Sequence, residues 1–224
     1  MDSCDFKNFR AIHRKDFLLE LIEEGEHEHQ DFKFAITTDS KKISRSIAAF
    51  ANNDGGRLLI GVKDNGSIAG MKGDEEYYMI DYAASTYCKP AQDVSYKLYN
   101  IGGKFVLLVD IRKSDKLVYA IDESGKWKAY YRYRDENIQM PGSIAEIVKL
   151  QKSSKRTATY ADNEALVLEH IVKLGRVTID SLYAEIKLSR KSLKEAIANL
   201  VILNVVKLEY DGENWCILQE HNDK

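Results

Sequence analysis

Three carboxylates and one lysine have the types and spacing that chemistry would need. Glu26 and Asp31 lie five positions apart, Lys33 follows Asp31 at the spacing of one strand face, and Asp64 follows a later apolar run. Carboxylates that converge in a sheet can hold Mg²⁺ or Mn²⁺ and activate water for phosphodiester cleavage, while a lysine stabilises phosphate charge. This pattern indicates a candidate nuclease site with Glu26, Asp31 and Asp64 as metal ligands.

A structural interpretation of the same residues stays open, and we favour it. In this interpretation the charged side chains form a surface salt-bridge cluster, and Asp64 caps the turn at Asn65-Gly66. The catalytic assignment of Glu26, Asp31, Lys33 and Asp64 then applies only if the protein is a nuclease. No cofactor is expected otherwise.

A helix and a buried strand must position these side chains. Ile43, Ile47 and Phe50 recur at helical spacing and predict a helix that starts near Asp39. Asn and Gly readily take the positive φ of a helix end, so the helix should stop before Gly55. The run from Leu58 to Val62 then predicts a strand that is covered on both faces.

An earlier strand and a tight turn complete this region. Alternation predicts that Phe32, Phe34 and Ile36 face the core, with Asp31 and Lys33 on the opposite face. The pair Asn65-Gly66 predicts a hairpin with a type I′ turn.

The order of these signals is specific. An acid-Phe-Lys motif (Asp31-Phe32-Lys33) precedes Ala49-Phe50-Ala51-Asn52, a glycine-flanked apolar strand and a late aromatic strand, Tyr130 to Arg134. The pattern resembles the Schlafen-type divergent AlbA domain over roughly the first two-thirds of the chain. The residues that would match the structural motif of that family are Asn52, Gly55, Gly56, Gly61 and Gly66.

The resemblance implies association with nucleic acid. Some Schlafen-type proteins cleave RNA with an acidic residue five positions before the acid-Phe-Lys motif, and Glu26 keeps that spacing. Asp31 stands where the family usually has Glu, which shortens the reach of the carboxylate.

The remaining pattern predicts an α+β fold, a mixed sheet of about five or six strands flanked by helices. Three helices and a hairpin with an Asp-Gly turn follow, and they resemble a winged helix-turn-helix domain. We therefore predict an AlbA-like domain over residues 1–150, a basic linker over 151–160 and a winged helix over 161–224.

Three groups of basic residues are candidates for nucleic-acid contact. One is an outward row on the aromatic strand, one surrounds the linker, and one lies at the start of the third tail helix, which a helix-turn-helix protein points into the major groove. The residues are Arg132 and Arg134; Lys149, Lys152, Lys155 and Arg156; and Arg190, Lys191 and Lys194.

Composition narrows the class of protein. The net charge is −2 and residues 149–160 carry four basic and no acidic side chains, so nucleic-acid contact must be local. No apolar run is long enough to cross a membrane, and three scattered cysteines favour a reducing compartment, so a cytoplasmic protein is expected. We predict a homodimeric DNA-binding regulator, with DNA favoured over RNA. The alternatives are a metal-dependent ribonuclease and a protein-interaction module.

Overall fold

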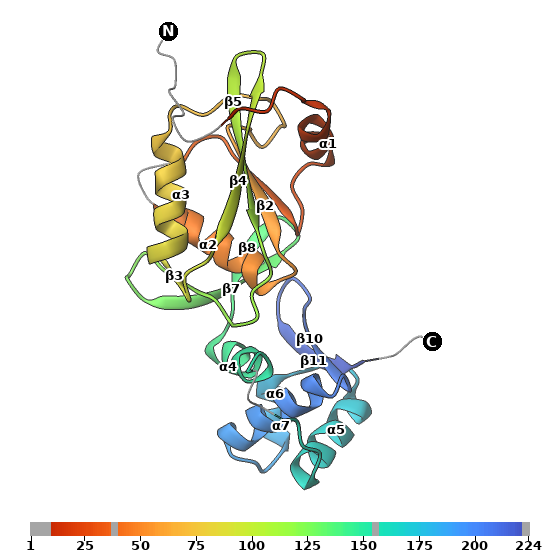
Figure 1. Ribbon diagram of the computed structural model, residues 1–224. Helices are drawn as coiled ribbons and strands as arrows, with labels where there is room; N and C mark the ends of the chain where they lie inside the picture. The colour runs from red at the N-terminus through yellow and green to blue at the C-terminus, as the bar shows by residue number, and fades with distance from the viewer. Residues whose placement is uncertain (1–9, 37–39, 154–156, 221–224) are drawn as a thin grey trace. The chain divides into compact units, whose positions relative to one another are not determined.

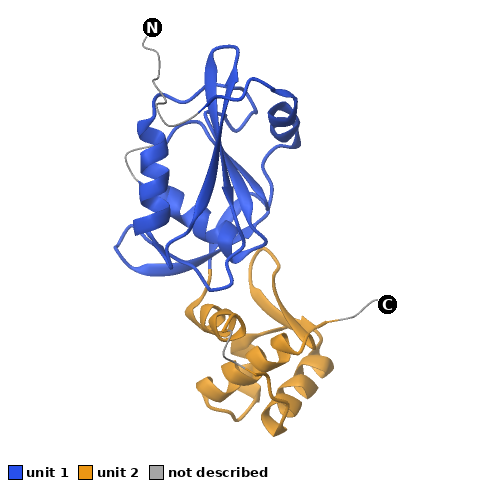
Figure 2. Ribbon diagram, in the orientation of Figure 1, with its two compact units in different colours: residues 1–139 blue, residues 140–224 orange. Residues whose placement is uncertain are grey.

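The computed structural model describes residues 10–36, 40–153 and 157–220. The chain divides into two compact units, Met1–Gln139 and Met140–Lys224 (Figure 2). Both units combine helices with strands, which confirms the predicted α+β class. The division differs from the predicted boundary at residue 150, because the helix at 142–151 places Ile147 in the core of the second unit.

The central sheet of the first unit has four strands in the order β1-β2-β5-β4 (Figure 1). A crossover through a helix explains why β1 and β2 are parallel, whereas the other neighbours are antiparallel. The elements are β1 (Gln30–Lys33), the crossover helix α2 (Ser40–Asn52), β2 (Gly56–Ile60), β4 (Val94–Ile101) and β5 (Lys104–Ile111).

A second four-stranded sheet, in the order β3-β6-β7-β8, lies across α2 from the first. The prediction of one mixed sheet was therefore wrong. Helix α2 explains the difference, since Ile47 and Phe50 are fully buried and the helix packs against strands of both sheets. The strands of this second sheet are β3 (Cys88–Lys89), β6 (Tyr119–Ile121), β7 (Trp127–Tyr133) and β8 (Glu136–Gln139).

Two further helices complete the first unit. Helix α1 (Asp16–Glu24) buries Leu18 and Leu21 against the outer face of the central sheet. Helix α3 (Glu75–Thr86) packs beside α2 and buries Ile80 in the main core. Both faces of β2 are covered, as predicted, because Leu58 joins one core cluster and Leu59 the other.

Two local predictions near the candidate site were wrong. Strand β1 ends at Lys33, and Phe34 is 48% exposed rather than buried. The turn at 63–67 closes with only an isolated bridge between Val62 and Ile68. Gly66 has a positive φ but Asn65 does not, so the turn is not of type I′, which needs positive φ at both central residues.

The second unit contains the predicted helices and hairpin, preceded by α4 (Gly142–Gln151). Ser189 caps the last helix as predicted, because its hydroxyl accepts a hydrogen bond from Ser192 N at 3.0 Å. The hairpin pairs with a short third strand. The elements are α5 (Asp162–Leu174), β9 (Val177–Thr178), α6 (Ile179–Glu185), α7 (Arg190–Ile202), β10 (Val206–Tyr210) and β11 (Trp215–Gln219).

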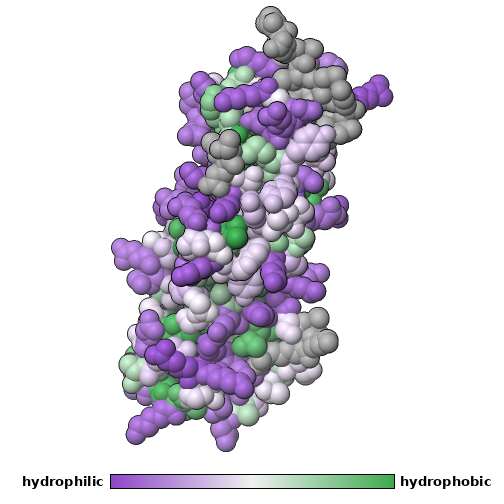
Figure 3. Space-filling model, turned by 90° about the vertical axis from the view of Figure 1, so that its left-hand side faces the viewer, coloured by the Kyte–Doolittle hydropathy of each residue, from purple (hydrophilic) through white to green (hydrophobic). Residues whose placement is uncertain are grey.

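The surface is mainly polar on the face shown in Figure 3, where hydrophobic side chains occupy small, separated areas. Within the described ranges, none of the helices has the length and apolar character that a membrane crossing requires.

Candidate functional site

A partly buried acid pair lies at the free edge of β1. Glu26 Oε1 accepts a hydrogen bond from Phe32 N at 2.8 Å, and the Glu26 carboxyl is also hydrogen-bonded to the Asp31 carboxylate. Burial and the bond to Asp31 raise the pKa of Glu26 to about 7. Burial alone would raise the pKa of Asp31, but the hydrogen bond from Glu26, with the charges of Lys33 and Arg132, lowers it. Below about pH 7 the pair therefore holds one proton, which Glu26 carries.

Two cations hold the charge of Asp31. Lys33 Nζ lies 2.7 Å from Asp31 Oδ2, and an Arg132 terminal nitrogen lies 3.3 Å from Oδ1. The Lys33 side chain is 35% exposed, whereas the Arg132 and Asp31 side chains are 1% and 4% exposed. The predicted outward row on β7 was therefore wrong at Arg132, whose guanidinium is buried over the Phe50 ring.

Side chains from α2 and β8 complete this buried network. Asn137 Oδ1 accepts a hydrogen bond from Arg132 at 3.1 Å, and Asn137 Nδ2 donates to Ser46 Oγ at 2.9 Å. The carbonyl of Gln30 accepts a hydrogen bond from Arg132 Nη2, the same nitrogen that faces Asp31. The Nε atom of Arg132 is buried and has no hydrogen-bond partner within the described ranges. Ser46 and Asn137 were not predicted, since an isolated polar residue in a helix or short strand has no sequence pattern of its own.

The predicted metal triad is not formed. Asp64 is exposed on the turn after β2, and no group of three or more His, Cys, Asp or Glu side chains in the described ranges is placed to hold a metal ion. Both carboxylate oxygens of Asp31 already contact cationic side chains, those of Lys33 and Arg132. These residues do not fit a divalent metal, so the convergence of Glu26, Asp31 and Asp64 that the nuclease alternative requires is not found among the described residues.

The motif residues of the α2–β2 segment have structural roles. Asn52 donates hydrogen bonds to the carbonyls of Val118 and Tyr130, and accepts one from Val118 N, each at 2.8 Å. This side chain thereby joins α2 to the second sheet. A Cβ at Gly56 would lie 2.3 Å from the Phe50 ring, so a larger residue there would displace the ring. Three other glycines of the motif have a positive φ, which L side chains rarely adopt: Gly55, Gly61 and Gly66.

A groove in the second unit gathers three of the predicted lysines. The cavity, about 350 Å³, lies between α4 and α7 and is lined by Lys149, Lys191 and Lys194 together with Glu146, Leu150, Ser153 and Glu195. Lys194 forms an ion pair with Glu146, so part of its charge is neutralised inside the unit. The sequence analysis placed Lys149 in the linker group and Lys191 and Lys194 in the helix group, and the packing of α4 on α7 brings the two groups together.

The other predicted basic residues are dispersed. Arg190 is exposed, with its guanidinium 5.3 Å from the centre of the Tyr183 ring. Arg134 is exposed beside Tyr133, at 5.2 Å from its ring centre. Lys152 follows α4 and is partly buried. Lys155 and Arg156 lie outside the described residues.

A family model described as Schlafen, AlbA_2 matches residues 26–141. The chain belongs to this family. The matched range begins at Glu26 and includes the acid pair, Arg132 and the Asn52 contacts, so the buried network lies within the family domain. A search of curated proteins found no match.

Two solved structures with similarity to the chain share a fifth or less of its sequence. The chain is 17% identical to the DIP2311 protein from Corynebacterium diphtheriae, with a TM-score of 0.45, and the match covers 86% of this chain and 34% of that one. It therefore spans about a third of that protein. The chain is 20% identical to the N-terminal domain of a putative ATP-dependent DNA helicase RecG-related protein from Nitrosomonas europaea, with a TM-score of 0.36. That match covers 69% of this chain and 92% of the other.

Proposed function

We propose that this Schlafen AlbA_2 protein binds DNA through the groove between α4 and α7 of its second unit, and that it acts as a homodimeric regulator. The observation that carries the proposal is the gathering of Lys149, Lys191 and Lys194 on one groove. Ammonium groups release condensed counterions when they contact phosphates, and this is the main source of sequence-independent affinity for DNA.

The second unit would act as a winged helix. Helices α5, α6 and α7 and the β10–β11 hairpin follow in the order of that domain. Arg190 and Lys191 lie in the first turn of α7, the helix that would enter the major groove. Lys149 on α4 would then contact the phosphate backbone beside it. A two-fold dimer would place two such helices on successive half-sites.

Salt-dependent binding tests the proposal. Fluorescence anisotropy with a labelled DNA duplex at several salt concentrations should give a slope of log K against log[salt] that a Lys149→Gln/Lys191→Gln double variant reduces by about 2. Lys173→Gln removes an exposed positive charge from α5 in the same unit and should leave the slope unchanged.

The result separates the regulator from its alternatives. Salt-insensitive or absent duplex binding by the folded wild-type protein would contradict the proposal and favour a protein-interaction module. Sedimentation velocity on the same sample, with and without duplex, measures whether the chain is a dimer when it binds.

A further inference from the structure

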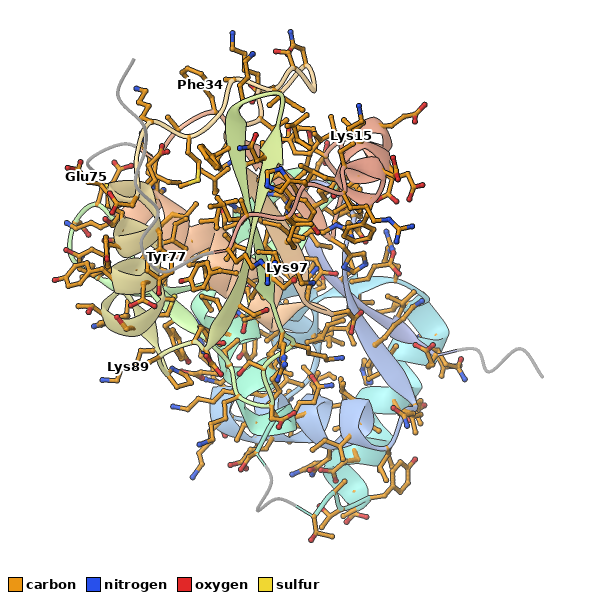
Figure 4. All side chains as sticks on the ribbon, turned by 45° about the horizontal axis from the view of Figure 1, so that its top comes forward. Lys15, Phe34, Glu75, Tyr77, Lys89 and Lys97 are labelled. Carbon is orange, nitrogen blue, oxygen red and sulfur yellow. The ribbon has the colours of Figure 1, made fainter. Side chains whose placement is uncertain are left out.

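An exposed aromatic ring in the first unit is flanked by two lysines. Phe34 directly follows β1, is 48% exposed, and lies at the upper edge of the unit in the view of Figure 4. The Nζ atoms of Lys63 and Lys72 lie 5.5 and 5.7 Å from the centre of its ring. The three side chains come from different segments of the chain: one after β1, one in the turn after β2 and one before α3.

A buried carboxylate fixes two of these segments. Glu76 on α3 is 4% exposed, and its two oxygens accept hydrogen bonds from Ile36 N at 2.7 Å and Lys72 N at 2.9 Å. The backbone two residues after Phe34 and the backbone of Lys72 are therefore held by one side chain. The turn that carries Lys63 is closed by the bond from Lys63 N to Ser67 O at 3.0 Å. These hydrogen bonds hold the backbone segments that carry the ring and both lysines in place without a ligand.

The energies favour replacement of a lysine–ring contact by a nucleobase. An exposed cation–π contact contributes about 0.5–1 kcal/mol. A base stacked on an aromatic side chain contributes about 1–3 kcal/mol, and the displaced ammonium group remains close enough to contact the adjoining phosphate. An acidic peptide would use the two lysines but would gain little from the ring. Bases within a duplex are already stacked, so the ligand must contain unpaired bases.

We infer that Phe34, Lys63 and Lys72 form a binding platform for single-stranded nucleic acid. One unpaired base stacks on the Phe34 ring, and Lys63 and Lys72 contact the phosphates on either side of it. The platform lies in the first unit and goes beyond the duplex groove of the proposed function, with which it shares only the class of ligand.

The test uses the full chain and two labelled oligomers of about twelve units, an oligothymidylate and an abasic strand with the same phosphates but no bases. We expect the wild-type protein to bind oligothymidylate about tenfold more tightly than the abasic strand. Phe34→Leu should remove that preference and leave abasic binding unchanged, whereas Phe34→Trp should retain it. The Lys63→Gln/Lys72→Gln double variant should weaken binding of both oligomers and reduce the slope of log K against log[salt] by about 1–2.

Phe17→Leu is the matched control, since Phe17 is 46% exposed on α1 of the same unit and should not affect binding. Circular dichroism and a thermal melt show whether each variant is folded. Equal binding of the two oligomers by the wild type, or unchanged oligothymidylate binding by Phe34→Leu, would overturn the inference. A polyglutamate peptide that competes fully with oligothymidylate irrespective of Phe34 would also overturn it.

The groove variant separates this inference from the proposed function. If Lys149→Gln/Lys191→Gln lowers duplex binding and Phe34→Leu lowers only oligothymidylate binding, both proposals stand. Loss of the oligothymidylate preference in Phe34→Leu without any wild-type duplex binding supports the platform alone.

Discussion

A terminal guanidinium nitrogen of Arg132 lies 3.3 Å from Asp31 Oδ1, and both side chains are almost fully buried. The two residues are far apart in the sequence, and their contact joins the edge strand β1 to β7 of the second sheet. Because Asp31 also contacts Glu26 and Lys33, one ionised carboxylate organises three charged or polar groups at this edge.

Arg132→Met should destabilise the protein by about 3–5 kcal/mol, since it leaves the buried Asp31 carboxylate without its deepest cation. Urea unfolding followed by circular dichroism measures the change. Arg134→Met removes the exposed arginine two positions away and should alter the free energy of unfolding by less than about 0.5 kcal/mol. Equal effects of the two substitutions would contradict the assignment of Arg132 to the buried network.

Glu26 should make the protein less stable as pH rises from about 5 to about 7. The folded protein binds the Glu26 proton more tightly than the unfolded chain, because the pKa is raised from 4.5 to about 7, so the free energy of unfolding falls with pH across that interval. The side chain is only partly buried, so solvent screening reduces the expected loss to on the order of 1 kcal/mol.

Glu26→Gln tests the assignment, since a glutamine amide can donate to Asp31 as the protonated carboxyl does. Unfolding in urea at pH 5, 6, 7 and 8 should show that the stability difference, variant minus wild type, increases with pH and levels off above about pH 7. A difference that is flat across this range would show that the acid pair does not share a proton.

Glu146→Gln should strengthen duplex binding by about threefold, because it releases Lys194 from its ion pair and removes a negative charge from the groove. Anisotropy titration at low salt measures the affinity. Glu169→Gln removes a negative charge from α5, outside the groove, and corrects for the change in net charge. Equal gains from the two variants would indicate a general charge effect.

Mg²⁺ or Mn²⁺ at millimolar concentration should shift the melting temperature by less than about 1 °C relative to chelator. A ligand that binds the folded state selectively raises its stability, and the structure brings no metal-binding triad together in the described ranges. A metal-dependent rise of several degrees that disappears in Asp64→Ala would contradict the observed arrangement and restore the nuclease hypothesis.

The sequence predicted where the helices and strands of this fold lie along the chain better than how they are arranged in layers. The periodicity of Ile43, Ile47 and Phe50 and the glycines that follow locate α2 and β2 closely, because those signals are local. The second sheet was not predicted, since it depends on α2 being buried on both sides. Buried positions on both faces of one helix do not reveal that two different sheets cover them.

The candidate site illustrates the same limit. Glu26, Asp31 and Lys33 lie within eight residues of one another, and their mutual contact was predicted because strand geometry fixes it. The inward direction of Arg132 depends on its contacts with Asp31 and Gln30 of β1, which lie far from it in the sequence. Glu76 was likewise missed, since its role is to accept hydrogen bonds from two loop backbones that carry no pattern.

The position of α4 determines how the chain can be divided. Ile147 is fully buried in the core of the second unit, together with Leu193 and Ile197 of α7. A fragment that starts at the predicted linker would remove that side chain and uncover the apolar surface of α7. A piece that is isolated, exchanged or fused to another protein should therefore include α4 rather than begin after the basic segment.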